Sequence, residues 1–217
     1  MKDGDKVKNI IIIGVGGFAR ELYWLIPQSV NVEKGFQIKG FLDGDVKLSD
    51  ESYEKLPMGL LGDVTTYNFQ EEDYLVCGIG TPDVREKIIR LAQERGGKFI
   101  SLVHRTAMLH GVKHLGEGII IGPYAGVGDA DEIGNHVVIN TASHLGHDVR
   151  VGDYSCIMAH VNLMGGSTVG NRVFIGGSAT ILPHAKIGDD AVVGAGSVVL
   201  KSVKKGKKVF GNPAMAL

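Results

Sequence analysis

A histidine and an aspartate stand next to each other at His147 and Asp148, and this pair has the residue types for proton transfer. A neutral imidazole ring accepts a proton near neutral pH, which makes histidine a common general base. A carboxylate that binds the other ring nitrogen selects the tautomer and raises the basicity of the ring. By position alone, a polar histidine is more often an ordinary surface residue, and the chain contains eight histidines. The role of the pair therefore depends on the structural elements that position it.

The region around this pair repeats with a period of six residues. From Leu109 to Val199, sixteen positions spaced six apart are all Leu, Ile or Val, and ten of them are followed by Gly. The residue four places after each aliphatic is mostly small or β-branched. This period fits neither an α-helix nor a hairpin, but it fits three short strands that close one triangular coil. The sequence predicts a left-handed parallel β-helix of about five coils, with glycine helping the chain to turn.

The period also predicts which residues lie beside one another on successive coils. His147 and Asp148 stand two and three places after Leu145, at a corner where side chains can point outward. Eighteen residues later the chain has Gly165, which we expect to stack beside His147. By the same step, Asn140 leads to Met158, and Gly177 leads to Ala195.

The first half of the chain has a different pattern and predicts a small Rossmann-like α/β domain. Short aliphatic runs alternate with segments of helical spacing, an order that favours a parallel sheet. We place the domain boundary between residues 104 and 105, giving domains 1–104 and 105–217. The expected strands are 9–13, 37–42, 74–79 and 98–103, and the expected helices are 18–27 and 82–95.

A glycine-rich loop follows the first expected strand and has three interpretations. Gly14, Gly16 and Gly17 after a strand resemble a dinucleotide-binding loop, and Asp43 follows the second strand as a ribose-binding acid would. The domain is short for a complete NAD site. The loop could also be a simple packing turn, or it could lie against a nucleotide other than NAD.

Composition excludes several classes of protein. The net charge of −1 offers no electrostatic attraction for nucleic acid or an acidic membrane, and Lys204–Lys208 suits a solvated surface. Cys77 and Cys156 are isolated, so they form neither a disulfide framework nor a metal knuckle. The apolar run Ile10–Ile13 is too short for a signal peptide or a membrane span, which favours a cytoplasmic protein.

The combination of a Gly-rich α/β domain with a hexapeptide β-helix resembles the bacterial PglD/NeuD-type sugar acyltransferases, over nearly the whole chain. The resemblance implies acetyl-CoA as co-substrate, a nucleotide-linked amino sugar as acceptor (a UDP- or dTDP-4-amino-4,6-dideoxyhexose), and no metal. It also implies a homotrimer with the active site between subunits, and direct transfer without an acyl-enzyme. The motifs that carry it are 14–19 (GVGGFA), 41–43 (FLD), 140–141 (NT), 147–152 (HDVRVG) and 211–214 (GNPA).

The resemblance also implies roles for individual residues. His147 corresponds to the general base, and Asp148 to the carboxylate that assists it. The expected acetyl-CoA contacts are Cys156, Gly165, Gly177 and Ala195. The expected sugar-nucleotide contacts are Gly16, Gly17, Phe18, Asp43 and Asn140.

Two positions depart from the family pattern. Cys156 stands where the family commonly has a second histidine, and nearby His160 is a candidate substitute. Phe18 stands where histidine is common, which puts the pyrophosphate contacts in doubt.

Three alternative functions remain open at this level. The same base would serve O-acetylation of a sugar or sialic acid. A metal site of the trimeric β-helix carbonic-anhydrase type is another, because several histidines lie on nearby coils: His136, His144, His147, His160 and His184. A non-catalytic scaffold is the third.

Overall fold

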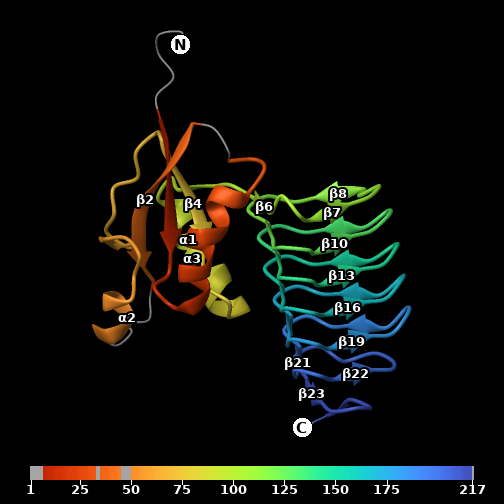
Figure 1. Cartoon of the computed structure of the whole chain (residues 1–217). Helices are drawn as coiled ribbons and strands as arrows, with labels where there is room; N and C mark the ends of the chain where they lie inside the picture. The colour runs from red at the N-terminus through yellow and green to blue at the C-terminus, as the bar shows by residue number, and fades with distance from the viewer. Residues whose placement is uncertain (1–6, 33–34, 45–49, 217) are drawn as a thin grey trace. The chain divides into compact units, whose positions relative to one another are not determined.

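The computed structural model describes residues 7–32, 35–44 and 50–216. They form two compact units (Figure 1): the first comprises the chain up to Gly80 and Val84–Leu102, and the second comprises Thr81–Asp83 and the chain from Val103 onward. Within these ranges no helix has the length and apolar character that a membrane crossing requires.

The first unit is built on one parallel sheet. Its elements are β1 (Lys8–Ile13), α1 (Gly17–Leu25), the 3₁₀ turn η1 (Ile26–Gln28), β2 (Phe36–Asp43), α2 (Asp50–Glu54), β3 (Leu60–Asp63), β4 (Asp73–Cys77), α3 (Pro82–Glu94) and β5 (Lys98–Phe99). The strand order is β3-β2-β1-β4-β5, and all four pairings are parallel. In the central strand β1, Ile10–Ile13 are fully buried, as expected for a strand covered on both faces.

Most predicted elements of this unit are confirmed, and one is wrong. The strand expected over 98–103 is two strands in different sheets: β5 pairs with β4, whereas β6 (Leu102–Val103) pairs with the β-helix. The chain changes sheet between them, because Ile100 N–H still donates to Leu75 O while His104 N–H donates to Ile121 O. Neither α2 nor the edge strand β3 was predicted, and β3 is only four residues long.

The second unit is a parallel β-helix with three sheets, one on each side of the coil, as predicted (Figure 1). Pairing partners are eighteen residues apart, as in His144↔Asn162 and Arg150↔Thr168. The first sheet contains β7 (Met108–Leu109), β10 (Gly126–Val127), β13 (His144–Leu145), β16 (Asn162–Leu163), β19 (Thr180–Ile181) and β22 (Val198–Val199). The second contains β8 (His114–Leu115), β11 (Glu132–Ile133), β14 (Arg150–Val151), β17 (Thr168–Val169) and β20 (Lys186–Ile187). The third contains β6, β9 (Ile120–Ile121), β12 (Val138–Ile139), β15 (Cys156–Ile157), β18 (Phe174–Ile175), β21 (Val192–Val193), β23 (Lys208–Phe210) and β24 (Met215–Ala216).

The repeated aliphatic residues form the core of this coil. From Ile121 to Val199 every one of them is buried, and so are the residues four places later. Leu109 is only half-buried and Leu115 is 37% exposed. Both lie on the first strands of their sheets, β7 and β8, so a neighbouring coil covers them from one side only.

The repeated glycine has a different role from the expected one. The chain turns at the residue three places after each aliphatic, where non-glycine residues such as Asp148 (φ 58°) and His160 (φ 61°) adopt the left-handed conformation. The glycine directly after the aliphatic instead lets the coils approach each other. A Cβ on Gly128 would lie 2.1 Å from the carbonyl oxygen of Gly146 on the next coil. The prediction that this glycine serves the turn is therefore wrong, and close stacking explains it.

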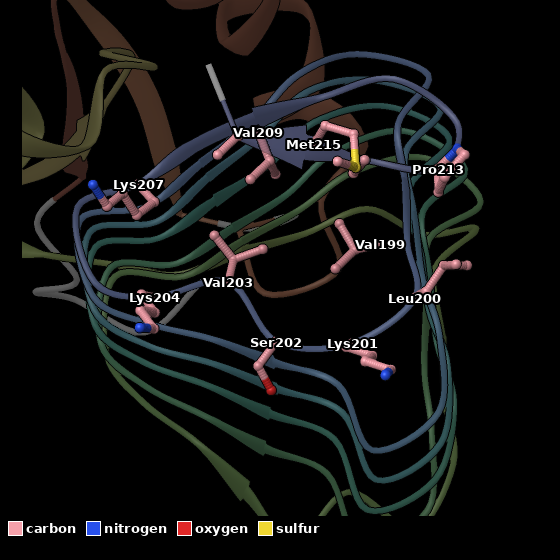
Figure 2. A pocket seen from close by; sticks show the side chains of 12 residues that line it. Val199, Leu200, Lys201, Ser202, Val203, Lys204, Lys207, Val209, Pro213 and Met215 are labelled. Atoms are coloured by element: carbon pink, nitrogen blue, oxygen red, sulfur yellow. The ribbon is translucent and has the colours of Figure 1, made fainter.

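The C-terminal end of the β-helix is a hollow in its last coil (Figure 2). Val199 and Val203 point into the coil, and Lys201, Lys204 and Lys207 lie around its edge. These three lysines are exposed, in agreement with a solvated basic segment. Strand β24 runs antiparallel to β23 and ends the sheet there.

Candidate active site

His147 and Asp148 form a hydrogen-bonded pair on a corner of the β-helix, between β13 and β14. His147 Nδ1 lies 2.7 Å from Asp148 Oδ2. Both side chains are largely exposed, at 70% and 66%. An Nδ1–H that donates to this carboxylate leaves Nε2 as the basic nitrogen of the ring. The pair therefore has the arrangement of a general base with an orienting acid.

The free end of the imidazole lies against the next coil at Gly165. A Cβ at this glycine would lie only 2.6 Å from His147 Nε2. The amide of Gly166 donates to the His147 carbonyl at 2.8 Å, which ties the two coils together at this point. Gly165 thus stacks beside His147 as the period predicts, and only a glycine leaves the ring its present position.

Three other predicted site residues share a second corner, between the third sheet and the first. Asn140 begins this corner, and its Oδ1 accepts from the Thr141 amide at 2.7 Å. Two coils later Gly177 lies there, and its carbonyl accepts from the amide of Gly196, directly after Ala195, at 2.9 Å. One chain therefore does not bring Asn140, Gly177 and Ala195 to the corner of His147.

Cys156 lies on β15 in the third sheet, between Val138 and Phe174 of the neighbouring coils. It is fully buried, and it is not joined to Cys77. The expected contact of Cys156 with acetyl-CoA beside His147 therefore finds no support within one chain. His160, the candidate substitute, is exposed on the corner of Asn140, where its amide donates to Thr141 O at 2.9 Å.

Of the other candidate histidines, His184 lies on the same corner two coils after His147, where its amide donates to the Gly165 carbonyl at 3.1 Å, and the others lie elsewhere. The His144 ring lies against Gly126 of the preceding coil, where a Cβ would be 2.6 Å from Nδ1, whereas His147 faces the following coil. His136 stacks on Tyr154 at a third corner, with ring centroids 5.4 Å apart. Among the residues described for this single chain, no three His, Cys, Asp or Glu side chains gather as metal ligands. A metal site of the anhydrase type would need side chains from several chains.

The α/β unit gathers its predicted site residues at the carboxyl edge of its sheet. β1 and β2 end side by side there, because Ile13 pairs with Leu42. Gly16 is the N-cap of α1 and offers no side-chain cap, and the amides of Gly17 and Phe18 lie in the first turn, where a helix supplies no carbonyl acceptor of its own.

Asp43, at the end of β2, is nearly buried and already has two hydrogen bonds. Its carboxylate accepts from the Gly44 amide at 2.7 Å and from the Tyr53 hydroxyl at 2.5 Å. Tyr53 had no signal in the sequence, because neither a repeat nor a motif marks it.

Comparison with known proteins agrees with both units. Residues 9–91 match the PglD N-terminal domain family, and residues 166–201 match the bacterial transferase hexapeptide (six repeats) family. PerB from Caulobacter crescentus, solved in complex with CoA and GDP-perosamine, is 27% identical with a TM-score of 0.84, covering 97% of this chain and 98% of that chain. This chain therefore combines a PglD N-terminal domain with bacterial transferase hexapeptide repeats.

Two more solved structures resemble this chain over nearly its whole length. WeeI from Acinetobacter baumannii AYE is 25% identical with a TM-score of 0.82, covering 97% of this chain and 100% of that chain. The acetyltransferase domain of PglB from Neisseria gonorrhoeae FA1090 is 23% identical with a TM-score of 0.82, again covering 97% and 100%, and it shows the shared fold.

The contact between His147 and Gly165 can be tested with Gly165→Ala. The added methyl group would overlap Nε2 and displace the ring, so we expect acetyl transfer to fall about a hundredfold. Because the φ of Gly165 is not in the left-handed region and the imidazole is exposed, the melting temperature should change little. Turnover and thermal unfolding measured on the same preparation check this. Full turnover in the variant would contradict the placement of the ring.

Proposed function

We propose that this protein transfers the acetyl group of acetyl-CoA to the amino group of a nucleotide-linked sugar. The observation that carries the proposal is the His147–Asp148 pair, whose Nε2 faces a bare glycine on the next coil. The match to the PglD N-terminal domain family supports the reaction class, and PerB, a relative with the same domain order, was solved in complex with CoA and GDP-perosamine.

In the proposed reaction, the acceptor amine attacks the thioester carbonyl carbon directly. His147 Nε2 takes the proton that the amine loses, and Asp148 stabilises the resulting imidazolium through Nδ1–H. The tetrahedral intermediate collapses, the C–S bond breaks, and the CoA thiolate leaves and receives a proton. No acyl-enzyme is required, because an amine is itself a good nucleophile.

A backbone amide beside His147 would stabilise the oxyanion of this intermediate. The amide of Gly166 already donates to the His147 carbonyl. This leaves the neighbouring amide of Gly165 as the candidate donor, on the coil that His147 Nε2 faces.

The α/β unit would bind the nucleotide part of the acceptor. The amides at Gly17 and Phe18, at the N-terminus of α1, suit phosphate oxygens. Asp43, at the end of the adjacent strand, would lie near the ribose or the base, held in place by Tyr53. We propose a UDP- or dTDP-linked 4-amino-4,6-dideoxyhexose as the acceptor. A cytoplasmic location follows from these activated substrates.

The site would be completed by a second copy of the chain. The corner of His147 and Gly165 and the corner of Asn140, Gly177 and Ala195 border the same sheet, which runs from β7 to β22. If three chains packed their β-helices side by side, these two different corners of neighbouring chains would meet, with acetyl-CoA between them. We therefore propose a homotrimer with shared active sites.

Substitution of His147 and of Asp148 should lower kcat to different extents. His147→Ala should lower kcat about a thousandfold or more, because the base is removed. Asp148→Asn should lower it about ten- to a hundredfold, because asparagine keeps the left-handed backbone but not the charge. Asp190→Asn is the matched control, since Asp190 has the same backbone conformation (φ 59°) at another corner and should keep full activity. CoA thiol release measures all three. Normal turnover by His147→Ala would refute the base assignment.

The acceptor can be identified with a panel of UDP-, dTDP- and GDP-linked amino sugars and their hydroxyl analogues, each with acetyl-CoA. We expect thiol release and an acetylated product only with an amino sugar. Acetylation of a hydroxyl analogue alone would replace N-acetylation by O-acetylation. The absence of turnover with every member, together with no binding of acetyl-CoA, would refute the proposal.

The quaternary structure has its own test. Light scattering coupled to gel filtration should give three times the mass of the 23.1 kDa chain. A monomer that retains full activity would contradict the shared site.

A further inference from the structure

Asp131 is a buried acid directly behind the candidate catalytic pair. It occupies the interior position four places after Val127, in the series that otherwise holds Ala, Val and Ser from Ala125 to Ser197. Its exposed fraction is 0%. A carboxyl group at an interior position of this coil costs solvation free energy, so its presence needs a reason.

The carboxylate binds the backbone on both sides of the active-site corner. Oδ2 accepts from the Gly128 amide of its own coil at 2.7 Å. Oδ1 accepts from the Val149 amide of the next coil at 2.8 Å. Val149 directly follows Asp148, whose own amide donates to Asp129 O at 2.9 Å. Two consecutive amides behind the catalytic pair are therefore held by the segment 129–131.

Elsewhere in the coil, a neutral serine performs the same structural task. Ser155 Oγ accepts from the Val173 amide, eighteen residues later, at 3.0 Å and donates to Gly170 O at 2.7 Å. Ser143 Oγ accepts from the Val161 amide in the same way, at 3.1 Å. Holding the next coil therefore does not require a charge, and the charge of Asp131 is what distinguishes its corner.

The electrostatics show that this charge opposes stability. Burial is the largest effect on the Asp131 carboxyl and raises its pKa, and the charge of Asp148 raises it further. The hydrogen bonds from the Val149 and Gly128 amides and the charge of His147 lower the pKa in part. The net direction is upward. A folded pKa above the unfolded value means that stability is full at low pH and decreases as Asp131 ionises. The ionised group therefore weakens the fold, while it attracts a cation at His147.

We propose that Asp131 is a positioning residue for His147, acting from inside the β-helix. Its carboxylate holds the corner through Val149 and supplies a second negative charge that favours the imidazolium formed as the base takes its proton. This inference rests on the proposed function of His147.

The other charged groups around His147 are the same in all variants used to test this. Asp148 is its direct partner, Asp129 lies on the preceding coil, and Arg150 follows on β14. His144 lies on β13 with its ring against Gly126 of the preceding coil, and His184 lies next to Gly166 of the following coil, where a Cβ on Gly166 would be 2.3 Å from its Nδ1. A difference between variants in pH dependence therefore reports on Asp131.

The test is the pH–rate profile of Asp131→Ser, which removes the charge and keeps the bond that serine makes elsewhere in the coil. We expect kcat near neutral pH to fall about tenfold and the acidic limb of the profile to move to lower pH by about one unit, because the imidazolium loses a favourable charge. The melting temperature should stay equal or rise. Asp131→Asn, of nearly the same shape, is the second variant if the serine variant does not fold, with the same expected shift.

Ser155→Ala is the matched control. It removes the equivalent backbone bond at another corner, so it should lower the melting temperature and leave the acidic limb in place. An unmoved acidic limb in the folded Asp131 variant would overturn the inference while the proposed function stands. A wild-type protein without acetyl transfer would instead remove the proposed function itself.

Discussion

The hydrogen bonds between successive coils are the constraint on which the second half of this protein depends. Each coil donates its strand amides to carbonyls of the next, as in His144 N–H to Val161 O at 2.9 Å and Gly146 N–H to Leu163 O at 2.8 Å. These bonds fix the register at eighteen residues, so every residue has a defined neighbour above and below. The glycine after each aliphatic residue belongs to the same constraint, because a Cβ would prevent the coils from approaching.

This register explains how the exposed side chain of His147 acquires a defined position. The ring of His147 is bounded on one side by Asp148 and on the other by Gly165 of the next coil. Asp148 adopts a left-handed backbone conformation, which aspartate tolerates better than most residues. The turn that every coil needs thus also directs the carboxylate toward the imidazole.

The interior of the coil takes part in the same arrangement. Serines at the small-residue positions connect neighbouring coils with a neutral hydroxyl, whereas Asp131 connects them with a buried carboxylate. The fold supplies the same interior position at each corner, and the active-site corner differs from the others because it has a charged residue there. In the first unit the parallel sheet has a similar role, because it brings the glycine-rich loop after β1 and Asp43 at the end of β2 to one edge.

The sequence by itself determined the architecture. An unbroken period of six residues admits one solution for the backbone, so the β-helix, its eighteen-residue register and the neighbours His147 and Gly165 were predictable, as was the parallel sheet of the first unit. The same register places Asn140, seven residues before His147, one corner earlier, together with Gly177 and Ala195. Only the tertiary structure decided the contacts that the repeat does not describe. It buried Cys156 completely and joined Tyr53 to Asp43. The physical reason is that the period reports which residues of the β-helix lie beside one another on successive coils, whereas burial and contacts with segments that lack a repeat depend on how the whole backbone folds.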